Sequence, residues 1–288
     1  MALRLSKKDL LLLKYLFECK FLTREQIGNY IWKDRKENYI YKRIYLLTKA
    51  GYIKKMPDPM ALNHNKTILQ ATEKAKITLS LHRNKLQYLT WNDNYKSAYY
   101  DPELYYDVQD DELDLKQYEH DRDINNIRFI FEKNGADNWK PHKVIYKDKK
   151  FRKKADGAFS KNGIVLAVEL EYNLKSSYVL KKIFESYRKM IINKDIHYIL
   201  YIVKNESIEE SMIKNFNPEM ILNFVDINDN YNPQRKSIFK KFDKETKEIT
   251  HYIYKHFTVT TFDKIINENF IFYNKDLELP IKQLLNGS

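Results

Sequence analysis

The order of helix-start signals near the beginning of the chain most constrains its fold. Ser6 is followed three residues later by Asp9, and Thr23 is followed three residues later by Gln26. In such a pair the first side chain caps a helix and the second reaches back to the capping residue, so each pair predicts a helix start. Apolar residues then recur at helical spacing over about residues 36–50. The first fifty residues are therefore expected to form three short helices.

The segment after these helices has the signals of a strand pair. Gly51 is placed to end the third helix, because glycine adopts the left-handed conformation that often follows a helix. Residues 52–55 and 67–70 predict short strands on either side of a turn-rich stretch, and Thr72 precedes a further helix. Three helices followed by a two-stranded hairpin is the order of a winged helix-turn-helix, which the words LLTKAGYIKK and LQATEKAK resemble.

The positive charge of the chain is confined to the same region. The protein has 288 residues and a net charge of +12. Residues 1–90 hold 19 Lys and Arg against 7 Asp and Glu, whereas residues 91–288 hold 32 of each kind. A basic excess on one region is typical of a polyanion-binding protein, so we expect residues 1–90 to be a winged-helix domain for double-stranded DNA. The alternatives are a solvated, Lys-rich surface and a winged helix that binds another protein.

A winged helix places its third helix in the major groove of DNA and its wing beside the phosphates. Lys42 and Arg43 are the best candidates for base-edge or phosphate contacts, because Arg grips guanine through two hydrogen bonds. Tyr39 is a candidate for stacking, or else it packs on the domain itself. The candidates for phosphate contacts are Lys36, Lys49, Lys54, Lys55 and Lys66. For any one of these residues, a solvated role is an equal alternative.

Residues 91–118 separate the basic region from the rest of the chain. They hold eight acidic and two basic residues, with Pro102 among them, so we expect a connector. The spacing of the acids does not match an EF-hand loop, which needs a central glycine and a terminal glutamate. We interpret the segment as a solvated linker or as an acidic flap that competes with DNA, rather than as a metal site.

Residues 119–288 have the signals of a mixed α/β domain. Asn162-Gly163 is a strong two-residue turn signal between two strand-like segments. The predicted order is a helix over 117–133, a short strand over 144–146, a hairpin with strands 154–159 and 164–171, a helix over 177–192 and a strand over 197–203. The basic, aromatic segment 235–257 is equally compatible with a second nucleic-acid surface and with an exposed hairpin.

This order resembles that of a known nuclease-like fold. Asp156 on one hairpin strand and Glu169 on the next are similar to the PD-(D/E)XK pattern. The whole layout, over roughly residues 6–205, resembles the replication-relaxation family of plasmids and other mobile elements. The motifs that carry this likeness are the N-terminal winged helix, HDRDINNIRFIF, KADGAFSKNGIVLAVELEYN and KKIFESYRK. The resemblance implies an α+β or α/β protein, with a winged helix followed by a PD-(D/E)XK-like mixed-sheet domain.

The resemblance also implies a set of site residues. In the nuclease-like pattern an Asp and a Glu, here Asp156 and Glu169, bind Mg²⁺ or Mn²⁺, which polarises the phosphate and activates a water. Glu171 is two residues further on the same strand, so it shares a face with Glu169 and is the third candidate metal ligand. The pattern has Lys at that position, and Glu171 removes the side chain assigned to water activation. The candidates for an extra acid and for relocated lysines are Glu119, Lys175, Lys181 and Lys182.

Together these features predict a cytoplasmic DNA-binding accessory protein for replication or transfer of a plasmid or mobile element, which assembles with other proteins. One alternative is a Mg²⁺-dependent endonuclease. Another is a homodimeric transcriptional regulator on paired half-sites. The carboxylates also have a purely structural interpretation, in which Glu169 and Glu171 form the polar face of an edge strand and Asp156 shapes a turn.

Several classes are excluded by what the sequence lacks. Six glycines form neither a phosphate-cradling loop nor a dinucleotide fingerprint, so ATPase and dehydrogenase activities are not expected. Cys19 is the only cysteine, which rules out an intramolecular disulfide and a cysteine zinc cage. No apolar run reaches the roughly 20 residues that span a bilayer, and the Leu-rich start is interrupted by charges, so neither a membrane span nor a signal peptide is expected.

Overall fold

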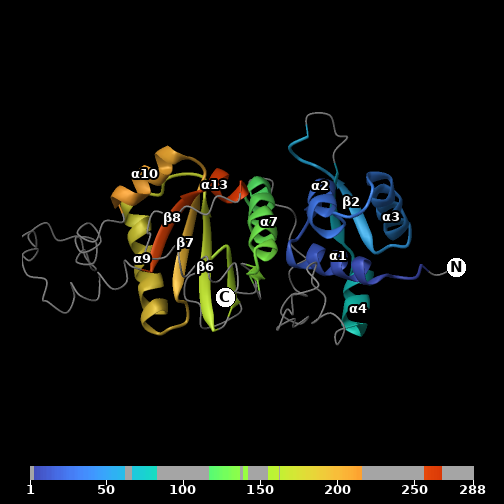
Figure 1. Ribbon diagram of the computed structural model, residues 1–288, viewed down its shortest axis with the longest axis horizontal. Helices are drawn as coiled ribbons and strands as arrows, with labels where there is room; N and C mark the ends of the chain where they lie inside the picture. The colour runs from blue at the N-terminus through green and yellow to red at the C-terminus, as the bar shows by residue number, and fades with distance from the viewer. Residues whose placement is uncertain are drawn as a thin grey trace, which may run out of the picture. The chain divides into compact units, whose positions relative to one another are not determined.

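The computed structural model describes residues 3–61, 67–82, 117–136, 139–141, 155–161, 163–215 and 256–267. The chain divides into two compact units, Met1–Lys147 and Asp148–Ser288, which are described one at a time (Figure 1). Within the described ranges, no helix combines the length and apolar character that a membrane crossing requires.

The first unit combines helices with a small antiparallel sheet of order β1-β3-β2 (Figure 1). The predicted third helix, strand pair and following helix are confirmed. The second helix begins in α-helical form and continues as one turn of π-helix. The elements are α1 (Lys7–Glu18), β1 (Leu22–Thr23), α2 (Arg24–Gln26), η1 (Ile27–Ile31), α3 (Glu37–Lys49), β2 (Ile53–Pro57), β3 (Thr67–Ala71), α4 (Glu73–Leu81), α7 (Tyr118–Lys133) and β4 (Lys140–Pro141).

Local side-chain contacts account for the ends of these helices. The Ser6 hydroxyl accepts a hydrogen bond from the main-chain N–H of Asp9, and the Asp9 carboxylate accepts one from the N–H of Ser6. Thr23 and Gln26 make the same reciprocal pair at the start of α2. Gly51 follows α3 with φ of +78°, a conformation that side chains rarely adopt. The capping residues and the stop predicted from the sequence are therefore confirmed.

Helix α7 packs into the core of the first unit. Phe129 is fully buried in the same apolar cluster as Leu12 and Leu16 of α1. Its ring stacks on Tyr30 with 4.6 Å between ring centroids and lies 5.2 Å from the ring of Tyr15. Sequence signals group this helix with the region that begins at residue 119. The apolar face of α7 instead finds its partners on α1 and η1, so the first unit extends beyond the connector.

The second unit is built on a mixed sheet. β5 pairs antiparallel with β6 across a turn at Gly163, and β6, β7 and β8 run parallel in that order. The predicted hairpin, long helix and following strand are confirmed. β8 was not predicted from the sequence. The elements are β5 (Gly157–Lys161), β6 (Ile164–Glu171), α9 (Ser177–Ile192), β7 (Tyr198–Val203), α10 (Glu206–Asn215), β8 (Phe257–Thr261) and α13 (Phe262–Ile266).

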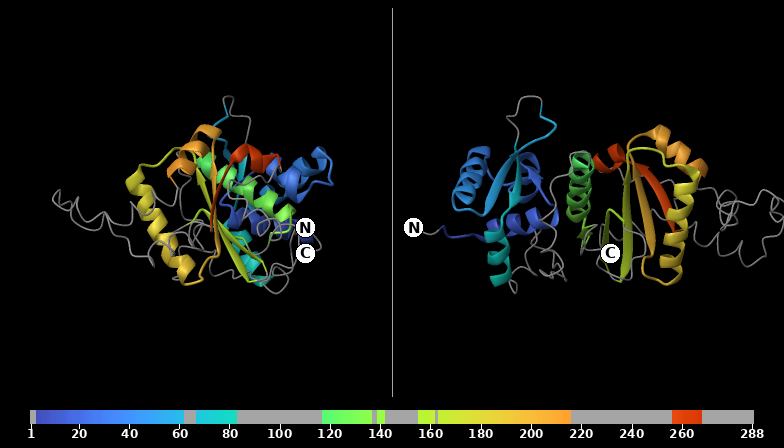
Figure 2. Two further views of the ribbon diagram at one scale, coloured as in Figure 1. Left: turned by 60° about the vertical axis from the view of Figure 1, so that its left-hand side comes forward. Right: turned by 180° about the vertical axis from the view of Figure 1, so that it is seen from behind.

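Helix α9 lies against one face of this sheet (Figures 1 and 2). Phe184 of α9 stacks on Phe257 of β8 at 5.1 Å between ring centroids, and Tyr187 meets the same ring edge-on at 6.2 Å. β6 pairs with β5 from Ile164 to Val168 and with β7 from Leu166 to Glu171, so β6 is not an edge strand of the sheet. The expectation of an edge strand is therefore wrong, and Glu169 and Glu171 are buried in the part of β6 that pairs with β7.

Some of the predicted features lie outside the described residues. These are the connector as far as residue 116, Lys66, the short strand over 144–146, and residues 235–255 of the basic aromatic segment. The side chain of Lys181 is also outside them.

Candidate functional site

One side of α3 is directed into the core and the other into solvent. Ile40, Ile44 and Leu47 are buried, as their helical spacing predicts. The residues at the complementary positions are exposed, and we call them the α3 face: Asn38, Tyr41, Lys42, Tyr45 and Lys49. The exposed fractions of the two tyrosines are 43% for Tyr41 and 56% for Tyr45, which are high for large aromatic side chains.

The positive charge of the α3 face continues onto the next strand, β2. Lys54 and Lys55 of β2 are both exposed. Residues 38–57 hold five basic residues and no acidic one. The stretch from Asn38 of α3 to Pro57 of β2 therefore presents positive charge without an interspersed carboxylate, and the exposed Glu37 lies just before it in the first turn of α3.

Arg24 joins α3 to the strand pair, and sequence reasoning did not single it out. Its guanidinium lies 4.1 Å from the ring centroid of Tyr41, and Nη2 is 3.4 Å from the hydroxyl of Thr67 on β3. Arg stacking on an aromatic ring is a common way to hold a cation at a surface. Sequence reasoning also passed over Tyr41 and Tyr45, although their spacing of four residues places them on one helix face.

Tyr39 and Lys36 lie at the beginning of α3. Lys36 is exposed and is the N-cap residue, although its side chain makes no capping hydrogen bond. Tyr39 is 43% exposed and lies edge-on to Trp32 at 6.2 Å between ring centroids. Arg35 lies 5.3 Å from the Tyr39 ring. Tyr39 therefore packs on the domain along one edge and keeps part of its ring in solvent.

Arg43 differs from the other basic residues of α3. Its Nε donates to Asp9 Oδ1 at 2.8 Å, and its Nη2 donates to the main-chain oxygen of Arg4 at 2.9 Å. The exposed fraction of its side chain is 15%. Arg43 therefore faces α1, and the structure gives it an internal partner rather than a place on the α3 face.

The second unit brings its three predicted carboxylates near one buried tyrosine. Glu169 pairs in register with Tyr201 of β7, and Asp156 directly precedes β5, whose first residue Gly157 pairs with Val168. Burial raises the pKa of Tyr201 well above its usual value, and the negative charges of Glu169, Glu171 and Asp156 raise it further. The antiparallel hairpin thus gathers acids that are 13 and 15 residues apart in sequence.

Each of these carboxylates accepts a hydrogen bond or forms an ion pair within the second unit. Asp156 Oδ2 accepts a hydrogen bond from the main-chain N–H of Leu170 at 2.8 Å. The buried Glu169 accepts one from the hydroxyl of Tyr187 on α9, and Glu171 forms an ion pair with Lys175. Among the described residues, no group of three His, Cys, Asp or Glu side chains is arranged to hold a metal ion. A requirement for Mg²⁺ or Mn²⁺ therefore stays a prediction.

The other candidates for this site lie on or next to α9 and in α7. Lys182 is exposed on α9, whereas Lys175 forms an ion pair with Glu171. Glu119 is half-buried in the first turn of α7, which belongs to the first unit.

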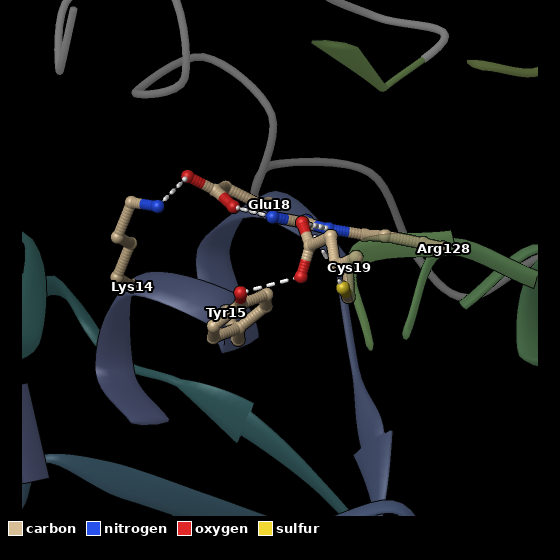
Figure 3. A network of polar contacts seen from close by, with 6 residues as sticks. Lys14, Tyr15, Glu18, Cys19 and Arg128 are labelled. Atoms are coloured by element: carbon tan, nitrogen blue, oxygen red, sulfur yellow. Dashed lines mark hydrogen bonds and ion pairs between the residues drawn. The ribbon is translucent and has the colours of Figure 1, made fainter. Parts of the chain in front are cut away.

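A buried charged network joins α1 to α7 in the first unit (Figure 3). Arg128 of α7 pairs with Glu18 and donates from Nε to Glu132 Oε1 at 2.8 Å. Lys14 Nζ lies 3.2 Å from Glu18 Oε1, and the hydroxyl of Tyr15 donates to Glu132 Oε2 at 2.6 Å. Burial alone lowers the pKa of Arg128, but Glu132 and Glu18 raise it well above its ordinary value. The network is enclosed and joins α7 to α1, which indicates a structural role.

Comparison with protein-family models, with characterised proteins and with solved structures finds no match.

Proposed function

We propose that the first unit is a winged helix that binds double-stranded DNA, with α3 in the major groove and the β2–β3 pair as the wing. The observation that carries this proposal is the composition of the α3 face, where Lys42 and Lys49 alternate with Tyr41 and Tyr45 on the solvent side of the helix. An α-helix fits the major groove of DNA, and base edges and thymine methyl groups are accessible there to polar and apolar side chains.

Electrostatics supports the same assignment. Lys54 and Lys55 extend the positive charge from α3 to the strand pair, as expected if the wing lies beside phosphates. Phosphate contacts release counterions from DNA, so the affinity should fall steeply as the salt concentration rises. Arg24, between Tyr41 and Thr67, is an additional candidate for a phosphate contact where the helix and the wing approach one another.

The second unit, on this proposal, is a PD-(D/E)XK-like domain with a degenerate site. The hairpin with Asp156 and Glu169, and the placement of Glu171 where the pattern has Lys, support that interpretation. Together with the resemblance to the replication-relaxation family, this leads us to propose a cytoplasmic accessory protein in replication or transfer of a plasmid or mobile element. Its partners would be DNA and other replication or transfer proteins.

DNA binding is tested by fluorescence anisotropy with a labelled mixed-sequence duplex over a range of salt concentrations. Lys42→Ala and Lys49→Ala should each weaken binding, and each should reduce the slope of log affinity against log salt by about 0.9 for the lost phosphate contact. Lys189→Ala, an equal charge change at an exposed position of α9, is the matched control and should leave the slope unchanged. No binding by the unaltered protein, or equal effects of all three substitutions, would contradict the proposal.

Endonuclease activity is a second candidate function, favoured by the gathering of Asp156, Glu169 and Glu171 around Tyr201. Supercoiled DNA incubated with Mg²⁺, Mn²⁺ or EDTA distinguishes the two. Nicking that needs the metal and disappears in Asp156→Ala would establish an enzyme. DNA that is retarded but intact in every lane would support a binding factor.

A further inference from the structure

One buried carboxylate connects the start of α1 to the middle of α3. The Asp9 side chain has an exposed fraction of 1%, and its Oδ2 accepts from both the N–H and the hydroxyl of Ser6 at 2.6 Å. The guanidinium of Arg43 approaches both carboxylate oxygens, with Nε 2.8 Å from Oδ1 and Nη2 2.5 Å from Oδ2. The same group that caps α1 therefore holds α3 through a two-point ion pair.

A two-point pair between a planar guanidinium and a carboxylate fixes orientation as well as distance. Arg43 is next to Lys42 in sequence, and it lies one turn before Leu47 of the buried side. Holding Arg43 against α1 thus sets the rotation of α3 about its own axis. The rotation of α3 decides whether Lys42, Tyr45 and Lys49 are directed outward together.

We propose that Arg43 is a positioning residue for DNA binding, which acts through Asp9 and does not itself touch DNA. This inference rests on the proposed function of the α3 face. The positioning role and simple electrostatics predict opposite changes in DNA affinity when Asp9 is replaced. Asp9 is a negative charge on a DNA-binding unit, so its removal should tighten binding if charge decides the outcome. If position decides, its removal should weaken binding, because α3 loses its orientation.

The test uses the full chain and the labelled mixed-sequence duplex at low salt. Asp9→Asn and Arg43→Lys each break the two-point pair, and Arg43→Lys also keeps the charge. Both should weaken binding by about tenfold or more, the effect of losing a charged hydrogen bond, with no change in the salt slope. Because both substitutions break the same ion pair, the double variant should bind DNA with an affinity no lower than that of the more weakly binding single variant. Asp34→Asn removes an equal charge from the exposed Lys8–Asp34 pair and is the matched control, which should not weaken binding.

Tryptophan fluorescence shows that each variant is folded under the binding conditions, since all three tryptophans lie in residues 1–147. If Asp9→Asn does not fold, Arg43→Lys decides the question. Unaltered affinity in Arg43→Lys, tighter binding by Asp9→Asn, or a lower unfolding midpoint with unchanged affinity would overturn the positioning role alone. Failure of the unaltered protein to bind the duplex would overturn the proposed function, and the positioning role with it.

Discussion

Arg128 of α7 and Glu18 of α1 form an ion pair in which each side chain has an exposed fraction of only 2% (Figure 3). The two residues are 110 positions apart in the chain. Placing two charges in the interior is unfavourable unless each is paired and hydrogen-bonded, and here Lys14 and Glu132 complete the network. The stability of the contact between α7 and α1 should therefore depend strongly on this ion pair.

Substitution of Arg128 should destabilise the first unit severely. Arg128→Met leaves Glu18 and Glu132 buried without their common partner, and breaking a buried pair in this way typically costs about 3–5 kcal/mol. Urea unfolding followed by tryptophan fluorescence measures the loss. Lys8→Ala is the control, because the Lys8–Asp34 pair has exposed fractions of 41% and 51% and should contribute under about 1 kcal/mol. Equal losses in the two variants would contradict this account of the network.

The network also predicts an acid dependence of stability. Burial raises the pKa of Glu18, but the positive charges of Lys14 and Arg128 lower it by more than burial raises it. The pKa of Glu18 therefore lies below its ordinary value. A carboxyl whose folded pKa is depressed stabilises the fold above its unfolded pKa of about 4.3. That contribution is lost as the pH falls through the folded pKa. Urea midpoints of the unaltered protein and of Glu18→Gln should therefore differ at neutral pH and converge in acid.

The exposed Glu25 provides a control for that measurement. Glu25→Gln changes the same chemical group on the same unit without touching the network. Its midpoints should follow those of the unaltered protein at every pH. A constant difference between Glu18→Gln and the unaltered protein from neutral to acid pH would show that Glu18 does not titrate as proposed.

Cys19 should be chemically inert in the folded protein. Burial raises the pKa of its thiol to about 12, and the side chain lies in the interior beside Arg128. At pH 8 such a thiol is ionised to roughly one part in 10⁴, and the thiolate is the reactive species. A disulfide reagent such as DTNB should release no chromophore from the native protein and one equivalent after unfolding in urea. Rapid stoichiometric reaction of the native protein would refute the burial of Cys19.

Tyr187 of α9 should stabilise the part of β6 that carries Glu169. Its hydroxyl donates to the buried carboxylate of Glu169, so Tyr187→Phe removes a donor and should cost about 1–3 kcal/mol. Hydrogen exchange of the β6 amides, measured by mass spectrometry, should become faster. Tyr198→Phe keeps the ring that stacks on His256 and should leave β6 protection unchanged. Unchanged exchange in Tyr187→Phe would mean that this hydrogen bond contributes nothing to β6.

The candidate sites were predictable to different degrees. The exposure of the lysines was predictable, for α3 from helical spacing and for β2 from the charge of the side chains. The structure leaves Lys42, Lys49, Lys54 and Lys55 exposed. Arg43 has the same sequence signature as its neighbours. Its partner Asp9 lies 34 residues earlier, so nothing local distinguished an internal ion pair from a surface contact. The roles of Arg24 and Tyr41 also depend on contacts between separate elements.

The starts of α1 and α2 and the end of α3 follow from local residues alone. The capping pairs Ser6–Asp9 and Thr23–Gln26 each join residues three positions apart, and α3 ends because Gly51 itself adopts a positive φ. Each of these signals therefore involves residues within a single helical turn. The packing partners of each element, by contrast, depend on the folded arrangement of the whole unit. Arg128 meets Glu18 because two buried faces bring distant charges together, and the energy of that pair depends on burial and on partners that no local pattern specifies.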